Sequence, residues 1–276
     1  MTLGELNRLI ISRLTPVLGA REASATSALL LEDNLGVGRT DLILKADRLL
    51  EPETEQRFSK FIDRIVAGEP PQYVVGKARF MGMDFVVGPE VLIPRPETAE
   101  LVDIVVDYAA GRHGLSILDV GTGSGCIAVA LSRAIPFAKL TAVDISEEAL
   151  RIARLNADRL HARIVFEQAD VLAGFDASSF DIVVSNPPYI AESEKTDIEG
   201  RVKDFEPHRA LFVPDSDPLV FYRAIAQSAP RAALFFEINP RFAAELSDML
   251  ESMDFSCEIR LDSFGKKRFA IAIPRS

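Results

Sequence analysis

The stretch Leu118-Asp-Val-Gly-Thr-Gly-Ser-Gly-Cys126 decides the fold. It joins one apolar run, Ser116–Val120, to a second, Ile127–Ser132, and the pair predicts a buried strand followed by a helix. Glycines at alternate positions allow a tight turn and let the backbone approach a ligand closely. A dinucleotide-binding fingerprint would have its third glycine at Cys126, so this loop follows a different spacing.

Segments with strand and helix character alternate from this stretch to the end of the sequence. The expected strands are Ser116–Val120, Leu140–Val143, Ile164–Glu167, Asp181–Ser185, Ala232–Ile238, Ser256–Leu261 and Arg268–Ile273. The expected helices are Ile127–Ser132, Glu147–Arg159, Pro218–Ser228 and Phe242–Met253. Such alternation predicts an α/β fold with a mostly parallel, seven-stranded sheet between two layers of helices. The last two strands are expected to form an antiparallel hairpin.

The part of the chain before this sheet has a different character. Its expected helices are one that starts with capping-box spacing at Thr2 and Glu5, then Ala23–Leu35, Thr40–Leu50, and one from Pro52 to Gly68. Glycines and prolines then interrupt short apolar runs, which predicts a β-hairpin linker. We therefore expect a helical substrate-docking domain at 1–70, a linker at 71–94 and an α/β domain at 95–276. A plain scaffold is the alternative for the helical domain.

The composition is that of a globular protein, with 48% hydrophobic and 26% charged residues in a chain of 276. No apolar run could span a membrane, and the first residues lack the basic and apolar blocks of a signal peptide. Cys126 and Cys257 lie far apart, so we expect a cytoplasmic protein without disulfides or bound metal. The net charge of -10 argues against non-specific binding of nucleic acid.

Polar residues follow the expected strands at the edge where parallel sheets bind ligands. Asp144 ends the second strand, and a carboxylate there can accept hydrogen bonds from ribose hydroxyls. Capping the next helix is its alternative role, unless Ser146 caps that helix instead. Asp170 and Val171 follow the third strand, where an acceptor beside a backbone N–H can bind the edge of an adenine. An ordinary polar loop is the alternative for these two residues.

The fourth strand stops abruptly within Val183-Val-Ser-Asn-Pro-Pro-Tyr-Ile190. Proline lacks an N–H and has a fixed φ, so Pro187 and Pro188 end the strand in a stiff, extended corner. Asn186 and Tyr189 flank this corner with an amide and an aromatic ring. A simple turn after a core strand is the alternative. The corner is expected at the same edge of the sheet as the glycine loop.

The glycine loop resembles the first motif of S-adenosylmethionine-dependent methyltransferases. The Asn-Pro-Pro-Tyr sequence resembles the motif of methyltransferases that act on planar amide or exocyclic amine nitrogens. Over nearly its whole length the chain resembles the release factor glutamine methyltransferase (PrmC/HemK) family. The segments that carry this resemblance are Gln72–Gly76, Val91–Thr98, Leu118–Cys126, Val184–Ile190 and Phe205–Leu211. Arg-Pro-Glu-Thr at 95–98 and Phe-Glu-Pro-His-Arg-Ala-Leu at 205–211 discriminate best between families.

The resemblance implies a Rossmann-like class I methyltransferase domain with S-adenosylmethionine as cofactor, S-adenosylhomocysteine as product, and no metal. It implies methyl transfer to the glutamine of the Gly-Gly-Gln loop in a class 1 peptide-chain release factor. That factor would be the protein partner, and neither a membrane nor direct contact with nucleic acid is expected. The implied cofactor-binding residues are Gly121, Thr122, Gly123, Ser124, Gly125, Asp144, Asp170, Val171 and Asn186. The implied catalytic residues are Asn186, Pro187 and Tyr189, and Pro188 joins them in binding the substrate.

The chemistry of a primary amide suggests what these residues do. Its nitrogen is a weak nucleophile because the lone pair is delocalised, so the site has to orient it. We expect Asn186 Oδ1 and the Pro187 carbonyl each to accept one hydrogen of the substrate NH₂, with Tyr189 packed over the amide. A strong general base is not required, since the methylated cation is acidic, and no histidine is assigned a role.

Other functions remain open at this point. A glutamine methyltransferase for a ribosomal protein would share the same motif. An adenine amino-methyltransferase is disfavoured by the net charge of -10 and by the lack of an obvious base-reading insertion. A non-catalytic nucleotide-binding module would require Asn-Pro-Pro-Tyr to be only a turn.

The chain departs from the usual family pattern in three places. These are Ala99, the segment Glu237–Arg241 and the segment Ser263–Gly265. All three are expected to lie away from Asn186–Tyr189, and so to affect loops and partner contacts more than the chemistry.

Overall fold

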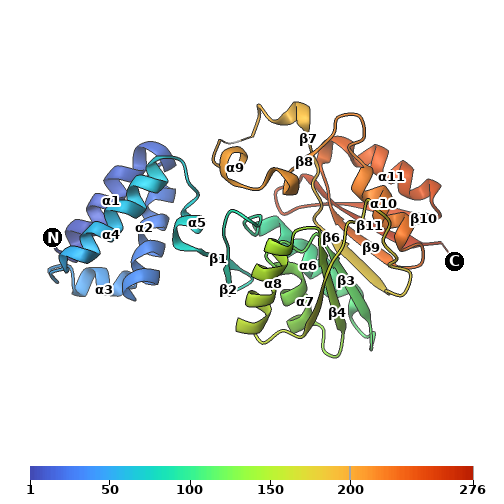
Figure 1. Ribbon diagram of the computed structural model, residues 1–276, viewed down its shortest axis with the longest axis horizontal. Coiled ribbons are helices and arrows are strands. Elements are labelled where there is room, and N and C mark those ends of the chain that lie inside the picture. Colours follow the sequence, from blue (N-terminus) through green and yellow to red (C-terminus); the bar gives the residue numbers. More distant parts are fainter. Residues whose placement is uncertain (199, 276) are drawn as a thin grey trace. The chain divides into compact units, whose positions relative to one another are not determined.

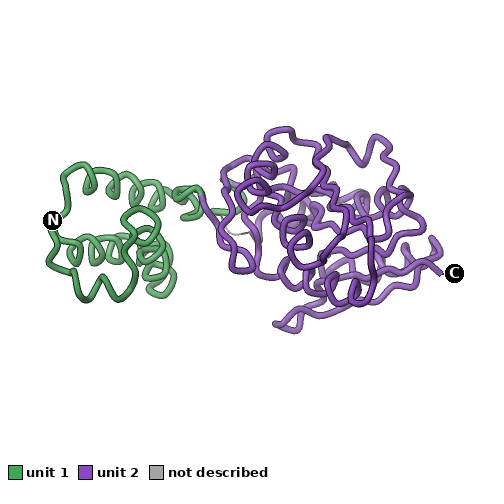
Figure 2. The backbone as a smooth tube through the Cα atoms, turned by 90° about the horizontal axis from the view of Figure 1, so that it is seen from below, with its two compact units in different colours: residues 1–76, 199–205 green, residues 77–198, 206–276 purple. Residues whose placement is uncertain are grey.

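The computed structural model describes residues 1–198 and 200–275. They form two compact units, drawn in green and purple in Figure 2. The first unit comprises residues 1–76 and 200–205, and the second comprises residues 77–198 and 206–275. No helix in the described part of the chain is both long and apolar enough to cross a membrane.

The first unit is a bundle of helices. They are α1 (Leu3–Leu18), α2 (Ala20–Leu35), α3 (Arg39–Leu44), α4 (Pro52–Val66), α5 (Pro71–Val75) and α9 (Gly200–Phe205). Apolar residues at helical spacing, such as Leu6 and Leu14, are buried in one core between α1, α2 and α4. The predicted capping box is confirmed, because the Thr2 hydroxyl accepts from Glu5 N and the Glu5 carboxylate accepts from Thr2 N.

The prediction of a helix over Thr40–Leu50 is wrong in its second half, because α3 ends at Leu44. The first N–H groups of a helix have no partner within it. Here the carbonyls of Ala46 and Arg48 accept from the first N–H groups of α1, at 2.8 and 2.9 Å. The chain after α3 is therefore held against the start of α1 instead of continuing as a helix.

The predicted β-hairpin forms and belongs to the second unit. Its strands β1 (Lys77–Phe80) and β2 (Met83–Val86) pair antiparallel. Asn156, buried in α8, anchors the hairpin: its Oδ1 accepts from Val86 N at 2.7 Å and its Nδ2 donates to Val86 O at 2.9 Å. The same Nδ2 donates to Ser124 O in the glycine loop at 2.9 Å. One buried amide thus links the hairpin to the loop.

The predicted α/β sheet and the helices that cover it make up the rest of the second unit (Figure 1). The strand order is β10-β11-β9-β6-β3-β4-β5. The strands are β3 (Ser116–Val120), β4 (Lys139–Asp144), β5 (Ile164–Gln168), β6 (Ile182–Ser185), β9 (Ala233–Glu237), β10 (Phe255–Leu261) and β11 (Lys267–Pro274). The helices are α6 (Pro96–Ala109), α7 (Cys126–Ala134), α8 (Glu147–Arg159), α10 (Val220–Ser228) and α11 (Ala243–Ser252). Short elements are β7 (Ile190–Ala191), β8 (Phe212–Val213), η1 (Glu192–Glu194), η2 (His208–Ala210) and η3 (Pro240–Phe242).

The strand directions agree with the prediction. Strands β9, β6, β3, β4 and β5 run parallel, and β10 and β11 form the expected antiparallel hairpin at one edge. Each strand and helix predicted for this part is present, with ends that agree within two residues. The fold is Rossmann-like, with the expected mostly parallel, seven-stranded sheet.

Helices cover both faces of the sheet. In β6, Ile182 and Val184 belong to the core that contains α6 and α7, whereas Val183 belongs to the core that contains α10 and α11. Successive side chains of a strand point to opposite faces, so a strand covered on both sides needs a continuous apolar run. The run before Asn186 has this character, which is why a strand forms there.

The strand order places two loops side by side. From β3 the chain proceeds outward through β4 to β5, and then returns to β6 on the other side of β3. Open α/β sheets bind ligands at the carboxyl ends of strands where the order reverses in this way. The last residues of β3 and β6, Val120 and Ser185, are register partners, and the Ser185 hydroxyl donates to the Val120 carbonyl at 2.7 Å. The glycine loop and the Asn-Pro-Pro corner therefore start next to each other.

Candidate active site

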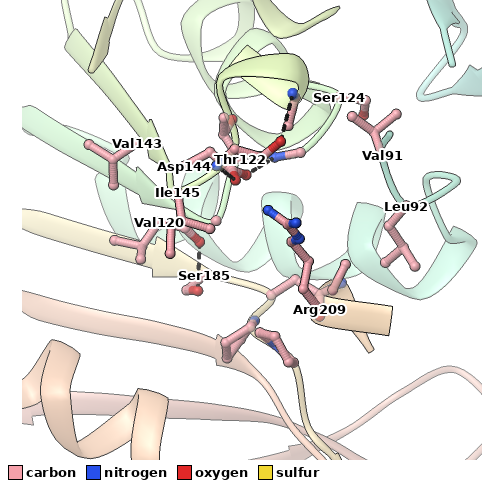
Figure 3. A pocket seen from close by; sticks show the side chains of 18 of the residues that line it. Val91, Leu92, Val120, Thr122, Ser124, Val143, Asp144, Ile145, Ser185 and Arg209 are labelled. Atoms are coloured by element: carbon pink, nitrogen blue, oxygen red, sulfur yellow. Dashed lines mark hydrogen bonds between the residues drawn. The ribbon is translucent and has the colours of Figure 1, made fainter. Parts of the chain in front are cut away.

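A pocket of about 420 Å³ lies in the second unit at the carboxyl ends of β3, β4 and β6 (Figure 3). Its volume is within the usual range of small-molecule sites. The residues expected at the site that line it are Gly121, Thr122, Gly123, Ser124, Asp144, Asp170, Val171, Asn186, Pro187 and Pro188. Gly125 and Tyr189 are not part of the lining. The glycine loop and the proline corner thus meet in one cavity, although they are far apart in the sequence.

The glycine loop is supported by residues outside the pocket. Gly125 has φ +80° at the start of α7, and a Cβ there would lie 3.1 Å from the Cβ of Ala153. Asp119 is fully buried, and its Oδ2 accepts from the Thr122 hydroxyl at 2.6 Å and from Ala128 N at 3.2 Å. Burial raises the pKa of Asp119 to about 7, and these two hydrogen bonds partly oppose that effect.

Asp144 lines the pocket at the end of β4. Its Oδ2 accepts from Gly123 N and its Oδ1 accepts from Ser146 N, both at 2.9 Å. Ser146 is the cap of α8, because its hydroxyl accepts from Ala149 N at 3.2 Å. Asp144 therefore does not cap that helix, and its carboxylate has lone pairs left for a ligand. Burial raises the pKa of Asp144, and the two N–H groups partly oppose the rise.

The loop after β5 was expected either to bind an adenine or to be an ordinary polar loop, and the structure is compatible with both. Asp170 Oδ1 accepts from Leu172 N at 2.9 Å, which is the local turn expected of a polar loop. Asp170 and Val171 nevertheless line the same pocket as Asp144. The turn leaves Asp170 exposed, so the carboxylate is accessible to a ligand.

The proline corner presents Asn186, Pro187 and Pro188 to the pocket. Tyr189 points elsewhere: its ring packs against the core under α10 and α11, and its hydroxyl donates to Glu237 Oε1 at 3.0 Å. Burial and the nearby Glu237 raise the pKa of the Tyr189 phenol, so this hydroxyl remains a donor.

Two buried residues that the sequence analysis did not assign to the site support the proline corner. Thr98, in the first turn of α6, accepts from Asn186 Nδ2 at 3.2 Å and donates to Glu237 Oε2 at 2.8 Å. Glu237 ends β9 and is 1% exposed. Burial raises the pKa of Glu237, and hydrogen bonds from Thr98 and Tyr189 partly oppose the rise. An acid at the end of the apolar strand Ala233–Glu237 was the available sequence signal for this residue.

An ion pair joins the two segments that discriminate the family. Arg95, which lines the pocket, donates to Glu206 Oε1 at 2.6 Å, and Glu206 Oε2 accepts from Ile93 N at 3.4 Å. Because Glu206 is only 3% exposed, its negative charge is compensated by the Arg95 guanidinium rather than by water. Val91–Ile93, one of the short apolar runs of the expected linker, is a loop that this pair holds as one wall of the pocket.

Arg209 is a cation at the same pocket. Its side chain extends from η2 toward Thr122 and Asp144 (Figure 3). Its charge lowers the pKa of Asp144, against the larger effect of burial. Among the described residues, no three His, Cys, Asp or Glu side chains are grouped so that they could hold a metal ion.

One expectation about the departures from the family pattern is wrong. Glu237 and Asn239 do not lie away from the corner, because Asn239 Nδ2 donates to the Tyr189 carbonyl at 3.0 Å and Glu237 binds the Tyr189 hydroxyl. The physical reason is that β9 is the parallel neighbour of β6, so the residues that follow the two strands meet. Ser263 instead donates to Glu100 at the outside of α6, from its N at 3.0 Å and its hydroxyl at 2.8 Å.

The chain is similar to known proteins over most of its length. The chain matches the sequence families described as PrmC N-terminal domain, over residues 10–76, and methyltransferase small domain, over residues 101–202. A release factor glutamine methyltransferase of Bacteroides thetaiotaomicron is 45% identical over 91% of this chain and 92% of its own length. One from Flavobacterium psychrophilum is 36% identical over 94% of both chains. A crystal structure of a release factor-specific protein-(glutamine-N5) methyltransferase from Alicyclobacillus acidocaldarius is 29% identical, with a TM-score of 0.41, over 70% of this chain and 100% of that one.

The relatives match the helical unit as well as the sheet, and their identity extends over nearly the whole length on both sides. The pocket contains the glycine loop and the proline corner on which the resemblance rested. On these grounds the chain belongs to the release factor glutamine methyltransferase family.

Proposed function

We propose that the protein transfers a methyl group from S-adenosylmethionine to the side-chain amide nitrogen of the glutamine in the Gly-Gly-Gln loop of a class 1 peptide-chain release factor. The observation that carries this proposal is the meeting of two parts in one pocket. One part is a glycine loop with an acidic wall, and the other is a stiff corner with amide and carbonyl acceptors. Membership of the family supports the choice of glutamine.

The residues of the pocket fit the proposed cofactor. Asp144 has free lone pairs for ribose hydroxyls, and Asp170 with Val171 offers an acceptor beside a backbone N–H for adenine. A Cβ added at Gly121 or Gly123 would meet nothing within 4 Å, so both glycines leave open space beside the loop. When bound, S-adenosylmethionine supplies an electrophilic methyl group on a cationic sulfur.

The corner would bind the substrate amide. Asn186 Oδ1 and the Pro187 carbonyl each accept one hydrogen of the glutamine NH₂, which fixes the rotation of the amide and stabilises the positive charge that develops on nitrogen. Pro187 and Pro188 keep these acceptors rigid before the substrate arrives. Tyr189, whose hydroxyl is bound by Glu237, does not line the cofactor pocket. Its proposed place is beside the substrate, on the side of the proline corner that faces away from the cofactor. The proton leaves the methylated amide without a general base from this chain.

We also propose that the helical unit docks the release factor, and that the reaction takes place in the cytoplasm without a metal. The narrow tip of a loop cannot by itself identify a release factor, so recognition would need a second surface. The helical unit, which matches the PrmC N-terminal domain, is the part of the chain available for that task.

Replacing Asp144 by Asn should weaken binding of S-adenosylhomocysteine by about 10- to 100-fold, since hydrogen bonds to a charged group contribute about 1.5–3 kcal/mol. The amide would also turn an N–H toward Gly123 N or Ser146 N, which are both donors. Isothermal titration calorimetry measures the effect. Asp176→Asn is the matched control, because Asp176 accepts from Ser178 N at 2.9 Å in a similar local turn outside the pocket. An Asp144→Asn affinity within twofold of the control would refute the assignment.

The second candidate substrate is a ribosomal-protein glutamine, and the adenine of a nucleic acid is the third. The protein should be incubated with S-adenosylmethionine and, in separate reactions, a class 1 release factor, total ribosomal protein and DNA. We expect a mass gain of one methyl group on the release factor alone. A gain on ribosomal protein or on DNA, with none on the release factor, would replace the proposed substrate.

A further inference from the structure

The amide of Asn186 is the end of a buried chain of hydrogen bonds. Asn186 Nδ2 donates to Thr98 Oγ1 at 3.2 Å, and Thr98 Oγ1 donates to Glu237 Oε2 at 2.8 Å. Thr98 is 2% exposed and Glu237 is 1% exposed, so water does not compete for these groups. Thr98 lies in α6, Glu237 ends β9, and Asn186 directly follows β6.

The chemistry of this chain sets its direction. Both oxygens of Glu237 accept, one from Thr98 and one from Tyr189, so the single hydrogen of the Thr98 hydroxyl is used on Glu237. Thr98 then offers Asn186 only lone pairs, and only the NH₂ side of the Asn186 amide can bind to them. If the amide were rotated by half a turn, Oδ1 and Oγ1 would face each other with no hydrogen between them. The orientation with Nδ2 toward Thr98 is therefore favoured, and it leaves Oδ1 as the atom available to the pocket.

The second carboxylate oxygen of Glu237 binds Tyr189, the residue that follows the two prolines of the corner. Glu237 Oε1 accepts from the Tyr189 hydroxyl at 3.0 Å. The backbone carbonyl of Glu237 accepts from the Tyr222 hydroxyl at 3.0 Å, which ties the end of β9 to α10. One buried carboxylate thus holds Asn186, through Thr98, and Tyr189, directly, on either side of the two prolines.

We propose that Thr98 and Glu237 are positioning residues that fix the Asn186 amide with Oδ1 toward the substrate. This inference rests on the proposed function for its consequence, that the site selects a substrate NH₂. With Oδ1 and the Pro187 carbonyl presented together, the corner offers two acceptors and no donor. A glutamine amide can satisfy both of them, whereas a glutamate carboxylate at the same place would present oxygens to oxygens.

The test compares Thr98→Val with Thr98→Ser. Valine has nearly the shape of threonine but can neither donate nor accept, whereas serine keeps the hydroxyl. We expect Thr98→Val to lower kcat for release factor methylation by about 10- to 100-fold, the size typical of a misoriented catalytic group. The KM for S-adenosylmethionine should change by less than about threefold, because the substitution does not alter the residues assigned to cofactor binding. Thr98→Ser should recover most of the lost kcat.

A second readout does not depend on any substrate. Asparagine labelled with a heavy nitrogen isotope makes the Asn186 side-chain NH₂ visible by NMR. In Thr98→Val these protons lose their acceptor, so their resonance should shift and their exchange with water should become faster. In Thr98→Ser both should return to the wild-type behaviour. Glu237→Gln, which keeps the shape but leaves one of the two hydroxyls without its acceptor, should also reduce kcat with cofactor KM retained.

The outcomes separate this inference from the proposed function. A wild-type kcat in both Thr98→Val and Thr98→Ser, or the same loss of kcat in both, would overturn the inference, because the hydroxyl would then not matter. If wild-type protein methylates no release factor, the proposed function fails, and the NMR comparison alone decides the inference. An Asn186 resonance that is the same in Thr98→Val as in wild type would then overturn it. If Thr98→Val does not fold, Glu237→Gln provides the test. A wild-type kcat and an unchanged Asn186 resonance in Glu237→Gln would overturn the inference.

Discussion

Asn186→Ala is expected to lower kcat for release factor methylation by about 100- to 1,000-fold, the loss typical of removing one preorganised hydrogen-bonding group from a transition state. The variant loses the Oδ1 acceptor that we assign to the substrate NH₂ and leaves Thr98 facing an empty space. The glycine loop and Asp144 do not depend on Asn186 for their hydrogen bonds, so much of the cofactor affinity should remain. Single-turnover methylation and calorimetry with S-adenosylhomocysteine measure the two quantities separately.

The control for this variant is a measurement of its thermal stability. Thermal unfolding of Asn186→Ala should stay close to that of the wild type, because Asn186 is only half-buried and its Nδ2 makes one side-chain hydrogen bond, to Thr98. Near-normal methylation by a folded Asn186→Ala protein would remove Asn186 from the mechanism. Thr98 would then have no catalytic group to position.

Gly125→Ala is expected to lower the free energy of unfolding by about 2–4 kcal/mol, from a strained backbone at positive φ and from overpacking of a tight contact. The new Cβ would lie 3.1 Å from Ala153 Cβ and 3.2 Å from Ala153 Cα, in α8. The Cα belongs to the backbone of a packed helix, so α7 and α8 would have to separate. Affinity for S-adenosylhomocysteine should fall as well, because Gly125 sets the turn that precedes α7. Urea unfolding of the second unit and calorimetry measure the two effects.

Gly265→Ala is the matched control for the backbone part of this effect. Gly265 also has φ +80°, but a Cβ there would meet nothing within 4 Å. It should therefore lose only about 1 kcal/mol, the cost of a left-handed conformation for alanine. Equal destabilisation by the two variants would show that the contact of Gly125 with Ala153 contributes nothing.

Much of the second unit could be predicted from its sequence because the cues there are local. A strand covered on both faces, such as β6, requires the continuous apolar run that stands before Asn186. The stop after it comes from prolines, whose geometry does not depend on the rest of the fold. Asp144 and the glycine loop were recognisable for a similar reason, because each lies at the end of a predicted strand.

The residues that support the corner could not be predicted in this way. Thr98 and Glu237 are 139 positions apart, and they meet only because β9 pairs with β6 while α6 begins beside both. Thr98 lies in the first turn of α6, and this local position does not reveal its buried partners. Glu237 gave a signal, an acid in a buried strand, but its partner depends on the order of strands in the sheet.

The errors in the helical unit have two origins. The end of α3 depends on carbonyls that bind the start of α1, which is a contact between distant segments. Helix α9 was not predicted, because six residues carry too little periodicity. Its Arg201 pairs with Glu22 of α2 at 2.9 Å, so this helix is part of the first unit although it lies far along the chain.

The most direct test of the account is to locate the transferred methyl group. A class 1 release factor treated with the protein and S-adenosylmethionine should be digested and sequenced by tandem mass spectrometry. We predict one added methyl group, on the side-chain nitrogen of the glutamine in the Gly-Gly-Gln loop, and none when that glutamine is replaced by glutamate. A methyl group on any other residue of the release factor, or full methylation by Asn186→Ala, would contradict the account.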